Sequence, residues 1–460
     1  MKLPAMTALE HGAFVFAGLL IYFIATRTGE QRRHPSAAIA WVVAIAAFPY
    51  LAIPLFLTFG RRKFVRPTHT VPAASGSPVA RTPQWANALL TGLGLPQPVP
   101  NASVTFQPQG ADSLAALIAL IAEARQTLEV GTFMLGADEV GAQVTDALVA
   151  AATRGVRARV LVDSVGNLKT PQSLLRHLRE GGVQVRSFMP LLHNPMRGRT
   201  NLRNHRKLAV ADGARLWSGG RNLAVEYFLD RPGHPAWVDL SFVAIGPVAT
   251  QARAQFEIDW ATAGGRVEPS PPTRHDVAHV EGPALAQWIP SGPDRAEDTL
   301  HALLMTAAYH ARDRILAVTP YFVPDEALLD AWCMASRRGV RISLVVPRQS
   351  NHRLADWARE RALRRLVQCG GQVWLAPEMV HAKALVVDDQ LALCGSLNLD
   401  GRSLFLNYEV MTGFYGPAEV AWLAQWQAQL VAQAQPYHGR RPPWWRDLLE
   451  GLVRSVGFQL

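Results

Sequence analysis

The sequence predicts an α/β protein of two homologous halves, preceded by two transmembrane helices. Three observations lead to this fold class. A motif of histidine, lysine and aspartate occurs twice, helical and extended patterns alternate from about residue 103, and two long apolar runs lie within the first 66 residues. Alternation of helical periodicity with short β-branched runs is typical of α/β proteins.

Residues 1–66 are expected to form a membrane anchor. Residues 37–59 contain no charged side chain, and a helix of 23 residues can cross a hydrocarbon core despite two internal prolines. The other run, residues 12–25, is shorter but extends back to Met6 if the polar residues between them lie among the headgroups. A cleaved signal peptide is the alternative, which the poor cleavage site and the second run disfavour.

The charges around the two runs favour a cytoplasmic position for the rest of the chain. Two spans form a hairpin, so both flanks lie on one side of the membrane. The flanks carry more basic residues than the connecting loop, and the positive-inside rule therefore places them in the cytoplasm. The flanking residues are Lys2, Arg61, Arg62, Lys63 and Arg66, and those of the loop are Arg27, Arg32 and Arg33.

After the anchor, the chain is expected to form a tether and two halves. Residues 67–102 are rich in proline, alanine, serine and glycine, which is typical of a tether, with one short helix over residues 84–90. Residues 103–283 and 284–437 are the first and second half. In the first half, periodicity predicts helices over residues 113–125 and 140–153, and strands over residues 127–133 and 156–163.

The C-terminal residues 438–460 are expected to form an amphipathic helix at a membrane surface. Apolar residues recur there at helical spacing, charged residues lie between them, and two adjacent tryptophans follow a Pro-Pro pair. A helix that packs its apolar stripe on the folded body is the alternative. The apolar residues are Trp444, Trp445, Leu448, Leu449, Leu452, Val453 and Val456.

Composition points to an anionic partner. With 460 residues, of which 49% are hydrophobic, the chain can bury a large core. The net charge of +10 fits nucleic acid, a phospholipid surface or a phosphorylated substrate, and does not choose among them. Cys333, Cys369 and Cys394 are scattered without C-x-x-C spacing, which favours a reducing compartment and no metal or redox pair.

The repeated motif is the strongest signal in the sequence. Each copy has a histidine, one residue, a lysine, four residues, an aspartate, six residues, a glycine, a glycine or serine, one residue and an asparagine. A second match at this spacing would arise by chance in well under roughly one random chain in ten thousand. The copies comprise His205, Lys207, Asp212, Gly220 and Asn222 in the first half, and His381, Lys383, Asp388, Ser396 and Asn398 in the second.

These residue types suit chemistry at a phosphate. Histidine and lysine alternate before an apolar strand, so both side chains point to one face. A lysine neutralises phosphate charge, while Asn222, Asn398, Gly220 and Ser396 offer further donors for its oxygens. One neutral imidazole can attack phosphorus while the other protonates the leaving alkoxide. The sequence therefore predicts one active site built from both halves, without a metal or another cofactor.

Carboxylates are expected to support the site. The second ring nitrogen of a catalytic imidazole is usually held by a carboxylate. The 34-residue step from His205 nominates Asp239, and the 28-residue step from His381 nominates Glu409 at the matched position of the second half. The aspartates of the motif itself, Asp212 and Asp388, are expected to order the strand ends and turns beneath the site.

Two further segments were considered for binding. The first half contains a net eight extra residues, placed within residues 187–204, and this basic segment either lines the mouth of the site or is a solvated insertion. His275 and His279 have the helical spacing of a ligand pair but lack supporting acids, so no metal site is expected.

Together these motifs resemble those of the phospholipase D superfamily, and within it the bacterial cardiolipin synthases of the phospholipase D type. The resemblance also covers residues 204–207, 259–260, 319–325 and 395–403. It implies a mixed β-sheet flanked by helices in each half, one site at a pseudo-twofold interface and a phosphohistidine intermediate. It further implies that two phosphatidylglycerol molecules condense to cardiolipin and glycerol at the bacterial inner membrane, with His205 as nucleophile and His381 as acid and base.

Other functions stay open from sequence alone. A membrane phospholipase D would use the same residues with water as the acceptor and yield phosphatidic acid, and a related transferase would use another alcohol. A nucleic-acid phosphodiesterase fits the basic balance, but the apolar runs and the tryptophan-rich tail disfavour it, so no nucleic acid partner is expected. A non-catalytic membrane scaffold is the last alternative. Nothing in the sequence predicts the oligomeric state.

Overall fold

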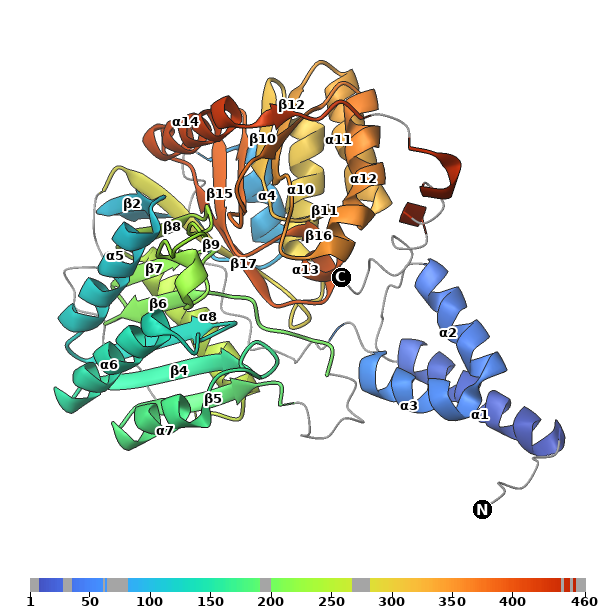
Figure 1. Cartoon of the computed structure of the whole chain (residues 1–460), viewed down its shortest axis with the longest axis horizontal. Coiled ribbons are helices and arrows are strands. Elements are labelled where there is room, and N and C mark those ends of the chain that lie inside the picture. Colours follow the sequence, from blue (N-terminus) through green and yellow to red (C-terminus); the bar gives the residue numbers. More distant parts are fainter. Residues whose placement is uncertain are drawn as a thin grey trace.

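The computed structural model describes residues 8–27, 35–60, 63, 82–190, 200–266, 282–439, 442–446 and 450–451. Two α/β halves lie side by side, and three N-terminal helices lie apart from them (Figure 1). The predicted fold class of two homologous α/β halves is therefore confirmed.

The first half is a seven-stranded mixed sheet in the order β2-β8-β7-β6-β3-β4-β5. The predicted helices and strands are present, with boundaries shifted by a few residues. Strand β3 is almost fully buried because helices cover both faces of the sheet, which explains its continuous apolar character. The elements are β2 (Ser103–Gln107), α5 (Gly110–Glu123), β3 (Thr127–Thr132), α6 (Glu139–Thr153), β4 (Arg157–Asp163), α7 (Gln172–Glu180), β5 (Gln184–Phe188), β6 (Leu208–Ala211), β7 (Arg215–Gly219), the 3₁₀ turn η2 (Val225–Tyr227), β8 (Ser241–Ile245) and α8 (Val248–Thr262).

The second half repeats this plan in a nine-stranded sheet in the order β1-β9-β17-β15-β14-β10-β12-β13-β18. A separate pair, β11 and β16, lies beside it. The elements are β9 (Ala284–Ser291), α10 (Thr299–His310), β10 (Arg314–Val318), β11 (Phe322–Val323), α11 (Glu326–Arg337), β12 (Arg341–Pro347), α12 (Arg353–Gln368), β13 (Gln372–Ala376), β14 (Ala384–Val387), β15 (Leu391–Gly395), β16 (Leu399–Asp400), α13 (Gly401–Phe405), β17 (Glu409–Phe414), α14 (Pro417–Gln433) and β18 (Gln435–Pro436).

The two sheets share one local topology around the motif. Strand β3 is parallel to β4 and antiparallel to β6, and β10 is likewise parallel to β12 and antiparallel to β14. Both sheets are therefore mixed, as expected. Each histidine–lysine pair directly precedes β6 or β14, so it lies at the edge of its sheet where the parallel strands end.

One hydrophobic core crosses the boundary between the halves. It contains residues of α8 and the first sheet together with residues of α14 and the second sheet. Phe414 of β17 packs edge-to-face against Phe106 and Phe242 of the first sheet, at 5.1 Å between ring centroids in each case. A shared core of this kind fixes the halves relative to each other, which a site built from both of them requires.

The predicted tether is wrong from residue 84 onward. Helix α4 (Gln84–Gly92), expected as a short helix, buries Ala86 and Leu90 in the core of the second half. Strand β1 (Val99–Asn101) then pairs with β9 of the second sheet, and β2 pairs with β8 of the first. The chain therefore contributes a helix and a strand to the second half before the first half begins, although its prolines suggested a flexible linker. Residues 64–81 lie outside the described residues.

The N-terminal helices differ from the expected pair of spans. Helix α1 (Ala8–Arg27) contains a stretch, Ala8–Thr26, that is long and apolar enough to cross a membrane. The second run divides into α2 (Pro35–Ala47) and α3 (Pro49–Phe59), because Phe48 leaves helical geometry before Pro49 at φ −139° and ψ 61°. Each piece is shorter than the roughly 20 residues that a span needs. Among the described helices, only one therefore meets the length of a span.

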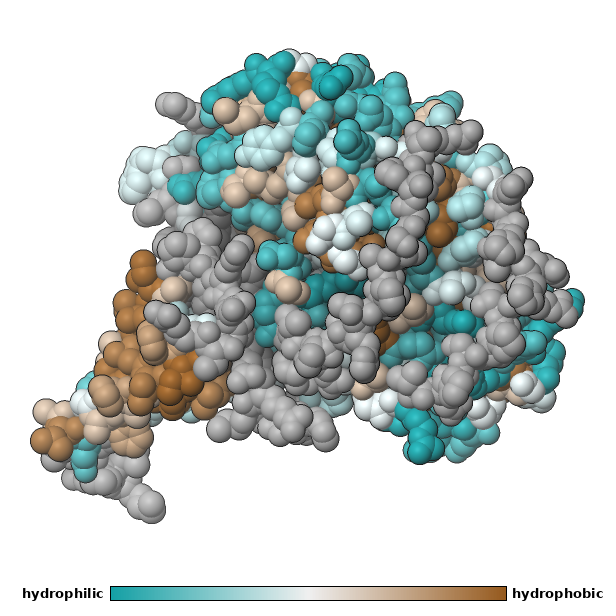
Figure 2. Space-filling model, turned by 180° about the vertical axis from the view of Figure 1, so that it is seen from behind, coloured by the Kyte–Doolittle hydropathy of each residue, from teal (hydrophilic) through white to brown (hydrophobic). Residues whose placement is uncertain are grey.

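The helices α1, α2 and α3 present an apolar surface outside the folded body. Figure 2 shows this brown surface beside the largely hydrophilic halves. Aromatic contacts join the helices, with Phe56 at 5.1 Å from Tyr22 and 5.3 Å from Trp41 between ring centroids. Just after α3, Lys63 reaches the second half, where its Nζ lies 2.7 Å from Asp298 Oδ1.

Candidate active site

The two motif histidines are attached to opposite halves by their own backbones. The N–H of His205 donates to the carbonyl oxygen of Tyr408 at 2.9 Å, and the N–H of His381 donates to that of Val238 at 2.7 Å. Each bond belongs to an isolated parallel β-bridge between the halves. One bridge joins Asn204 to Tyr408 and the other joins Val238 to Val380. Because Tyr408 and Val238 each precede a predicted acid, the bridges bring each histidine to the acid of the other half.

The predicted pairing of histidines and acids is therefore wrong, although the four residues are correctly nominated as neighbours. Nδ1 of His381 lies 2.6 Å from Oδ2 of Asp239, and Nδ1 of His205 lies 3.4 Å from Oε1 of Glu409. The prediction paired residues within each half because it measured steps along the chain. The crossed arrangement arises because the strand ends pair across the interface.

Asp239 and His381 form a close pair in which both pKa values are lowered. Burial raises the pKa of the Asp239 carboxyl, but His381 and Lys383 outweigh it and lower the pKa to about 2. Burial, followed by the charge of Lys383, lowers the pKa of His381 to about 4. At neutral pH this gives an ionised carboxylate beside a neutral imidazole, whose Nε2 lies 3.0 Å from Nζ of Lys383.

Glu409 and His205 differ from this pair. Burial raises the pKa of Glu409 to about 7 in spite of Lys207, and its carboxylate accepts hydrogen bonds from Ser396 and Asn407. Burial, and then the charge of Lys207, lowers the pKa of His205 well below its ordinary value. The His205 side chain is nonetheless 20% exposed, so a ligand can reach it.

The two histidines and the two lysines of the motif belong to one cluster. The charges of Lys383 and His381 lower the pKa of His205, and the charge of Lys207 lowers that of His381. Nζ of Lys207 donates to the carbonyl oxygen of His205 at 2.7 Å, while Nζ of Lys383 lies within 3.0 Å of the ring nitrogens of His381. The structure thus brings the two copies of the motif together.

The lysines are expected to give the reaction an alkaline limit. Burial lowers the pKa of Lys207 to about 8 and that of Lys383 to about 7. Only a protonated lysine attracts a phosphate, so kcat/KM, which reports the free enzyme, should fall as the pH rises through 7 to 8. Lys383→Arg keeps its charge in this range and should move the fall to higher pH. A pH profile of kcat/KM that does not change in this variant would contradict the assignment.

The predicted phosphate ligands have different surroundings. Nδ2 of Asn222 donates to the Tyr227 hydroxyl at 2.7 Å, and Oδ1 of Asn222 and of Asn398 has no hydrogen-bond partner within the described part of the chain. These oxygens are acceptors, whereas a phosphate oxygen needs a donor, so the binding of phosphate by Asn222 and Asn398 stays a prediction. Ser396 instead donates to Glu409, and a Cβ at Gly220 would lie 2.2 Å from Oδ1 of Asp239. These two residues serve the acids, and their donation to a phosphate stays a prediction.

Aromatic side chains that sequence reasoning missed flank both histidines. The ring centroid of Phe133 lies 4.2 Å from that of His205, and those of Tyr227 and Trp237 lie 4.9 and 5.7 Å from that of His381. Arg402 also acts on the site, because its charge lowers the pKa of His205. Phe133 ends the predicted strand before the site and Trp237 precedes Asp239, but an isolated aromatic residue carries no motif by which to recognise it.

Asp212 and Asp388 lie outside the cluster, at the far ends of β6 and β14. The Asp212 carboxylate accepts the backbone N–H groups of residues 125–127 at 2.7 to 3.0 Å. Asp388 does the same for residues 312–314. Both residues have positive φ, +53° and +50°, a conformation that aspartate tolerates better than most residues. Grouping them with the catalytic residues is therefore wrong, whereas their expected role at the strand ends is confirmed.

Asp212→Ala is expected to affect stability without affecting chemistry. It removes the acceptor of three backbone N–H groups and puts an alanine at positive φ, which together should reduce the free energy of unfolding by about 2 to 4 kcal/mol. The turnover of the folded enzyme should stay within about twofold of wild type, because the residue touches no member of the cluster. Denaturant unfolding in detergent and steady-state kinetics measure the two quantities. A large loss of turnover with unchanged stability would return Asp212 to the active site.

Other predicted binding segments fall partly outside the described residues. These comprise residues 191–199 of the basic insertion, the His275 and His279 pair, and residues 447–449 and 452–460 of the tail. Arg203 of the insertion is described, and it is buried against Asp163 at 3.3 Å, so it does not face an incoming headgroup. Within the described ranges, no group of three or more histidine, cysteine, aspartate or glutamate side chains is placed to hold a metal ion.

Comparison with known proteins finds that the chain is similar to enzymes of phospholipid synthesis. The family model described as "Cardiolipin synthase, PLD-like domain" matches residues 117–260 and 304–431. Cardiolipin synthase A from Klebsiella pneumoniae strain 342 is 30% identical over 468 residues, which cover 94% of this chain and 95% of the relative. Cardiolipin synthase A from Yersinia pseudotuberculosis serotype IB is 30% identical over 471 residues with the same coverage.

A solved structure shares the fold. The crystal structure of phosphatidylserine synthase from Haemophilus influenzae Rd KW20 superposes with a TM-score of 0.62 and covers 82% of this chain and 100% of that one. At 16% identity, this likeness supports the duplicated α/β architecture and nothing more specific.

Proposed function

Because the chain belongs to the cardiolipin synthase family with phospholipase D-like domains, we propose that it transfers a phosphatidyl group between two phosphatidylglycerol molecules. The products are cardiolipin and glycerol. The observation that carries this proposal is the single cluster of two imidazoles and two lysines, in which Nδ1 of each imidazole faces a carboxylate of the opposite half, at 2.6 Å for His381 and 3.4 Å for His205.

In the first step, His205 attacks the phosphorus of one phosphatidylglycerol. The bond between phosphorus and the glycerol headgroup oxygen breaks, and the imidazolium form of His381 protonates the departing oxygen and becomes neutral. A phosphatidyl group is then bound to His205 as a phosphohistidine. The lowered pKa of His205 keeps its imidazole neutral and nucleophilic, and Lys207 and Lys383 neutralise the phosphate. A bound phosphate also offsets the lysine charges that lower the pKa of His381, which favours its acid form.

In the second step, a second phosphatidylglycerol supplies the acceptor. His381 takes the proton of its terminal headgroup hydroxyl, the oxygen attacks phosphorus, and the bond to His205 breaks. The resulting His381 imidazolium faces the ionised Asp239, which stabilises it. Protons and bonds balance over the two steps without a metal or another cofactor.

Hydrolysis is the second candidate function, with water in place of the acceptor lipid. The same residues would serve it, and the Phe133, Tyr227 and Trp237 rings beside the histidines favour transfer because they displace water from the cluster. Purified protein incubated with labelled phosphatidylglycerol distinguishes the two. Cardiolipin with an equimolar amount of glycerol supports transfer, whereas phosphatidic acid without cardiolipin would replace the proposal by a phospholipase.

The apolar N-terminal helices support a place in the bacterial inner membrane. Helix α1 crosses the bilayer, and α2 with α3 forms the return, which leaves the catalytic halves in the cytoplasm. Trp444 and Trp445, 80% and 51% exposed, lie at the start of the tail and favour its contact with the headgroup region. Phosphatidylglycerol is thus reached from the membrane surface.

Two exposed leucines border the site and fit this orientation. Leu168, 65% exposed beside Lys169, lies in the loop after β4, and the neighbouring Asn167 donates to the carbonyl oxygen of Phe133 at 2.8 Å. In the second half, Leu354, 57% exposed beside Arg353, lies in the first turn of α12, which follows β12. Both leucines lie where the parallel strands end, the edge that also holds the histidines. A leucine paired with a cation suits the interface of an anionic bilayer.

Leu168→Ser with Leu354→Ser is expected to impair access to lipid in bilayers. Turnover of long-chain phosphatidylglycerol in vesicles should fall about 30-fold, because the two leucines together contribute of order 2 kcal/mol of apolar burial at the interface. Turnover of a short-chain phosphatidylglycerol dissolved as monomers should be unchanged. Met334→Ser, which changes an equally exposed residue near the C-terminal end of α11, is the matched control. Equal loss on both substrates would contradict the orientation.

A further inference from the structure

Two buried arginines hold the backbones of the two acids. Nη2 of Arg221 donates to the carbonyl oxygen of Asp239 at 2.6 Å, and Nε of Arg206 donates to that of Glu409 at 3.1 Å. Neither arginine is more than 2% exposed. Both arginines belong to the first half. The matched positions of the second copy are Ala382 and Leu397, so the second copy has no arginine at either position. The first copy of the motif therefore supplies both arginines that bind the backbones of the two acids.

Arg221 is contained within the first half. Besides Asp239, its guanidinium donates to carbonyl oxygens and one hydroxyl of that half, namely Gln107, Pro108, Tyr227 and Ser241, at 2.7 to 3.1 Å. The position of Asp239 is therefore set by contacts within the first half. His381 of the second half contacts Asp239 at that position.

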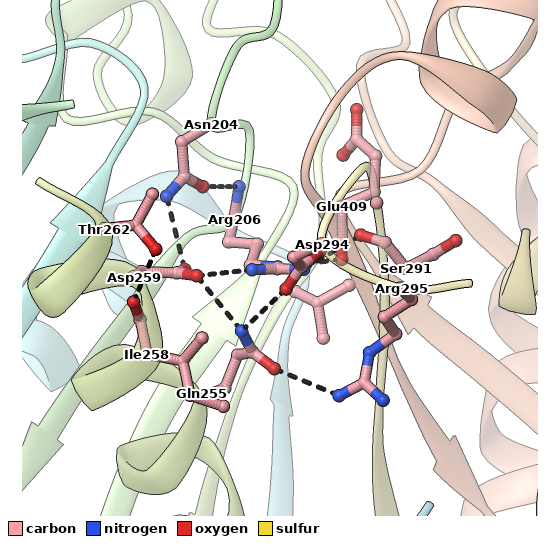
Figure 3. A network of polar contacts seen from close by, with 12 residues as sticks. Asn204, Arg206, Gln255, Ile258, Asp259, Thr262, Ser291, Asp294, Arg295 and Glu409 are labelled. Atoms are coloured by element: carbon pink, nitrogen blue, oxygen red, sulfur yellow. Dashed lines mark hydrogen bonds and ion pairs between the residues drawn. The ribbon is translucent and has the colours of Figure 1, made fainter. Parts of the chain in front are cut away.

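Arg206 instead joins the halves. It lies between His205 and Lys207 in the sequence, and its side chain belongs to the polar network shown in Figure 3. On the first half, Nη1 donates to Asp259 at 2.6 Å. On the second half, Nη2 donates to the carbonyl oxygen of Ser291 at 2.9 Å and to Asp294 at 3.3 Å. One guanidinium therefore contacts the first half, the 291–294 segment and the strand that carries Glu409.

The same segment also contacts the membrane anchor. Nζ of Lys63 donates to the carbonyl oxygen of Gly292 at 3.2 Å and pairs with Asp298 at 2.7 Å. Gly292 lies close to Arg206, since a Cβ at Gly292 would meet Nη2 of Arg206 at 3.3 Å. The anchor, the 291–298 segment, Arg206 and Glu409 thus form a continuous series of contacts that ends at His205.

We propose that Arg206 is a positioning residue that sets the Glu409 carboxylate against His205, and that Arg221 does the same for Asp239 and His381. The inference rests on the proposed function for its kinetic part only. Each arginine acts through the backbone of an acid, and neither touches the reacting phosphate. Because each arginine binds the backbone of a different acid, the two histidines respond separately to loss of the two arginines.

Arg206→Lys is the kinetic test on the full-length enzyme. A lysine keeps the charge for Asp259 and Asp294, but it cannot bind them and the Glu409 carbonyl together. We expect kcat to fall about 10- to 100-fold with little change in KM, because misplacement of a catalytic group acts on turnover. In a Glu409→Gln background, the same substitution should cost less than about twofold. Arg159→Lys, which changes a buried arginine paired with Glu129 and Glu257, is the control for stability loss alone.

A chemical test does not depend on activity. Diethyl pyrocarbonate modifies neutral imidazoles, and peptide mass spectrometry measures the rate at each histidine. Arg206→Lys should raise the rate at His205 about threefold or more and leave His381 unchanged, whereas Arg221→Lys should give the reverse, as release of a held ring nitrogen exposes it.

These outcomes separate the inference from the function on which it rests. Wild-type protein that forms no cardiolipin would refute the proposed function and leave the labelling result decisive for the arginines. Unchanged kcat in Arg206→Lys, an equal loss in the Glu409→Gln background, or labelling that rises equally at both histidines would overturn the positioning role.

Discussion

Replacement of either His205 or His381 by asparagine is expected to reduce phosphatidyl transfer by about 10⁴-fold or more. Asparagine retains a polar side chain but can neither attack phosphorus nor carry a proton between substrate and enzyme. The double variant should be no worse than the poorer single variant, because one reaction cannot proceed without both groups. Rates of cardiolipin formation by the three purified variants measure this directly.

The control for these variants is His177→Asn, at an exposed histidine on α7 that pairs with Asp146 on the protein surface. It should retain wild-type turnover. If one motif histidine proved dispensable, or if the double variant lost the product of the two single losses, the histidines would act independently and the shared site would be refuted.

Asp239→Asn is expected to lower turnover about 10³-fold, and Glu409→Gln less. Asp239 is ionised, with a pKa of about 2, and lies 2.6 Å from His381, so an amide removes its charge and misorients the imidazole. Glu409, with a pKa of about 7, is partly protonated at neutral pH and 3.4 Å from its histidine, so glutamine changes less.

An activated substrate tests the crossed pairing. The p-nitrophenyl ester of phosphatidic acid has a leaving group that needs no protonation. The burst of p-nitrophenolate should therefore survive in Asp239→Asn and His381→Asn, and should be lost in His205→Asn and reduced in Glu409→Gln. If Asp239→Asn behaved like His205→Asn instead, the acids would pair within halves as the sequence spacing suggested.

Sequence periodicity and the repeat were sufficient to predict the two α/β halves and to nominate the histidines, lysines and acids that lie together, but not residues 84–102 or the N-terminal helices. The two motif copies fall before β6 and β14, so a local pattern of alternating residues determines the face on which histidine and lysine lie. Asp239 and Glu409 were found because each copy offers an acid at the matched position. These inferences depend on the local alternation of side chains and on matched positions in the two copies, both of which can be read directly from the sequence.

Contacts across the interface were not accessible in the same way. The crossed acids follow from the bridges between Asn204 and Tyr408 and between Val238 and Val380, which join segments that no sequence step relates. Arg206 and Arg221 occupy motif positions at which the two copies differ. A comparison of the copies therefore gives no reason to single them out. The helix break at Phe48 was missed because the span was predicted from hydropathy. Hydropathy reports how apolar a segment is and not the backbone restriction that a proline places on the residue before it.

The most direct test of the central claim counts the phosphatidyl groups bound to the enzyme during reaction. Phosphate-labelled p-nitrophenyl substrate is mixed with His381→Asn protein, which is denatured rapidly at neutral pH and analysed by peptide mass spectrometry. The account predicts at most one label per chain, on His205, and none in the His205→Asn variant. Label on a residue other than His205, or on each histidine of one wild-type chain at the same time, would show that the two imidazoles do not act on one phosphorus atom.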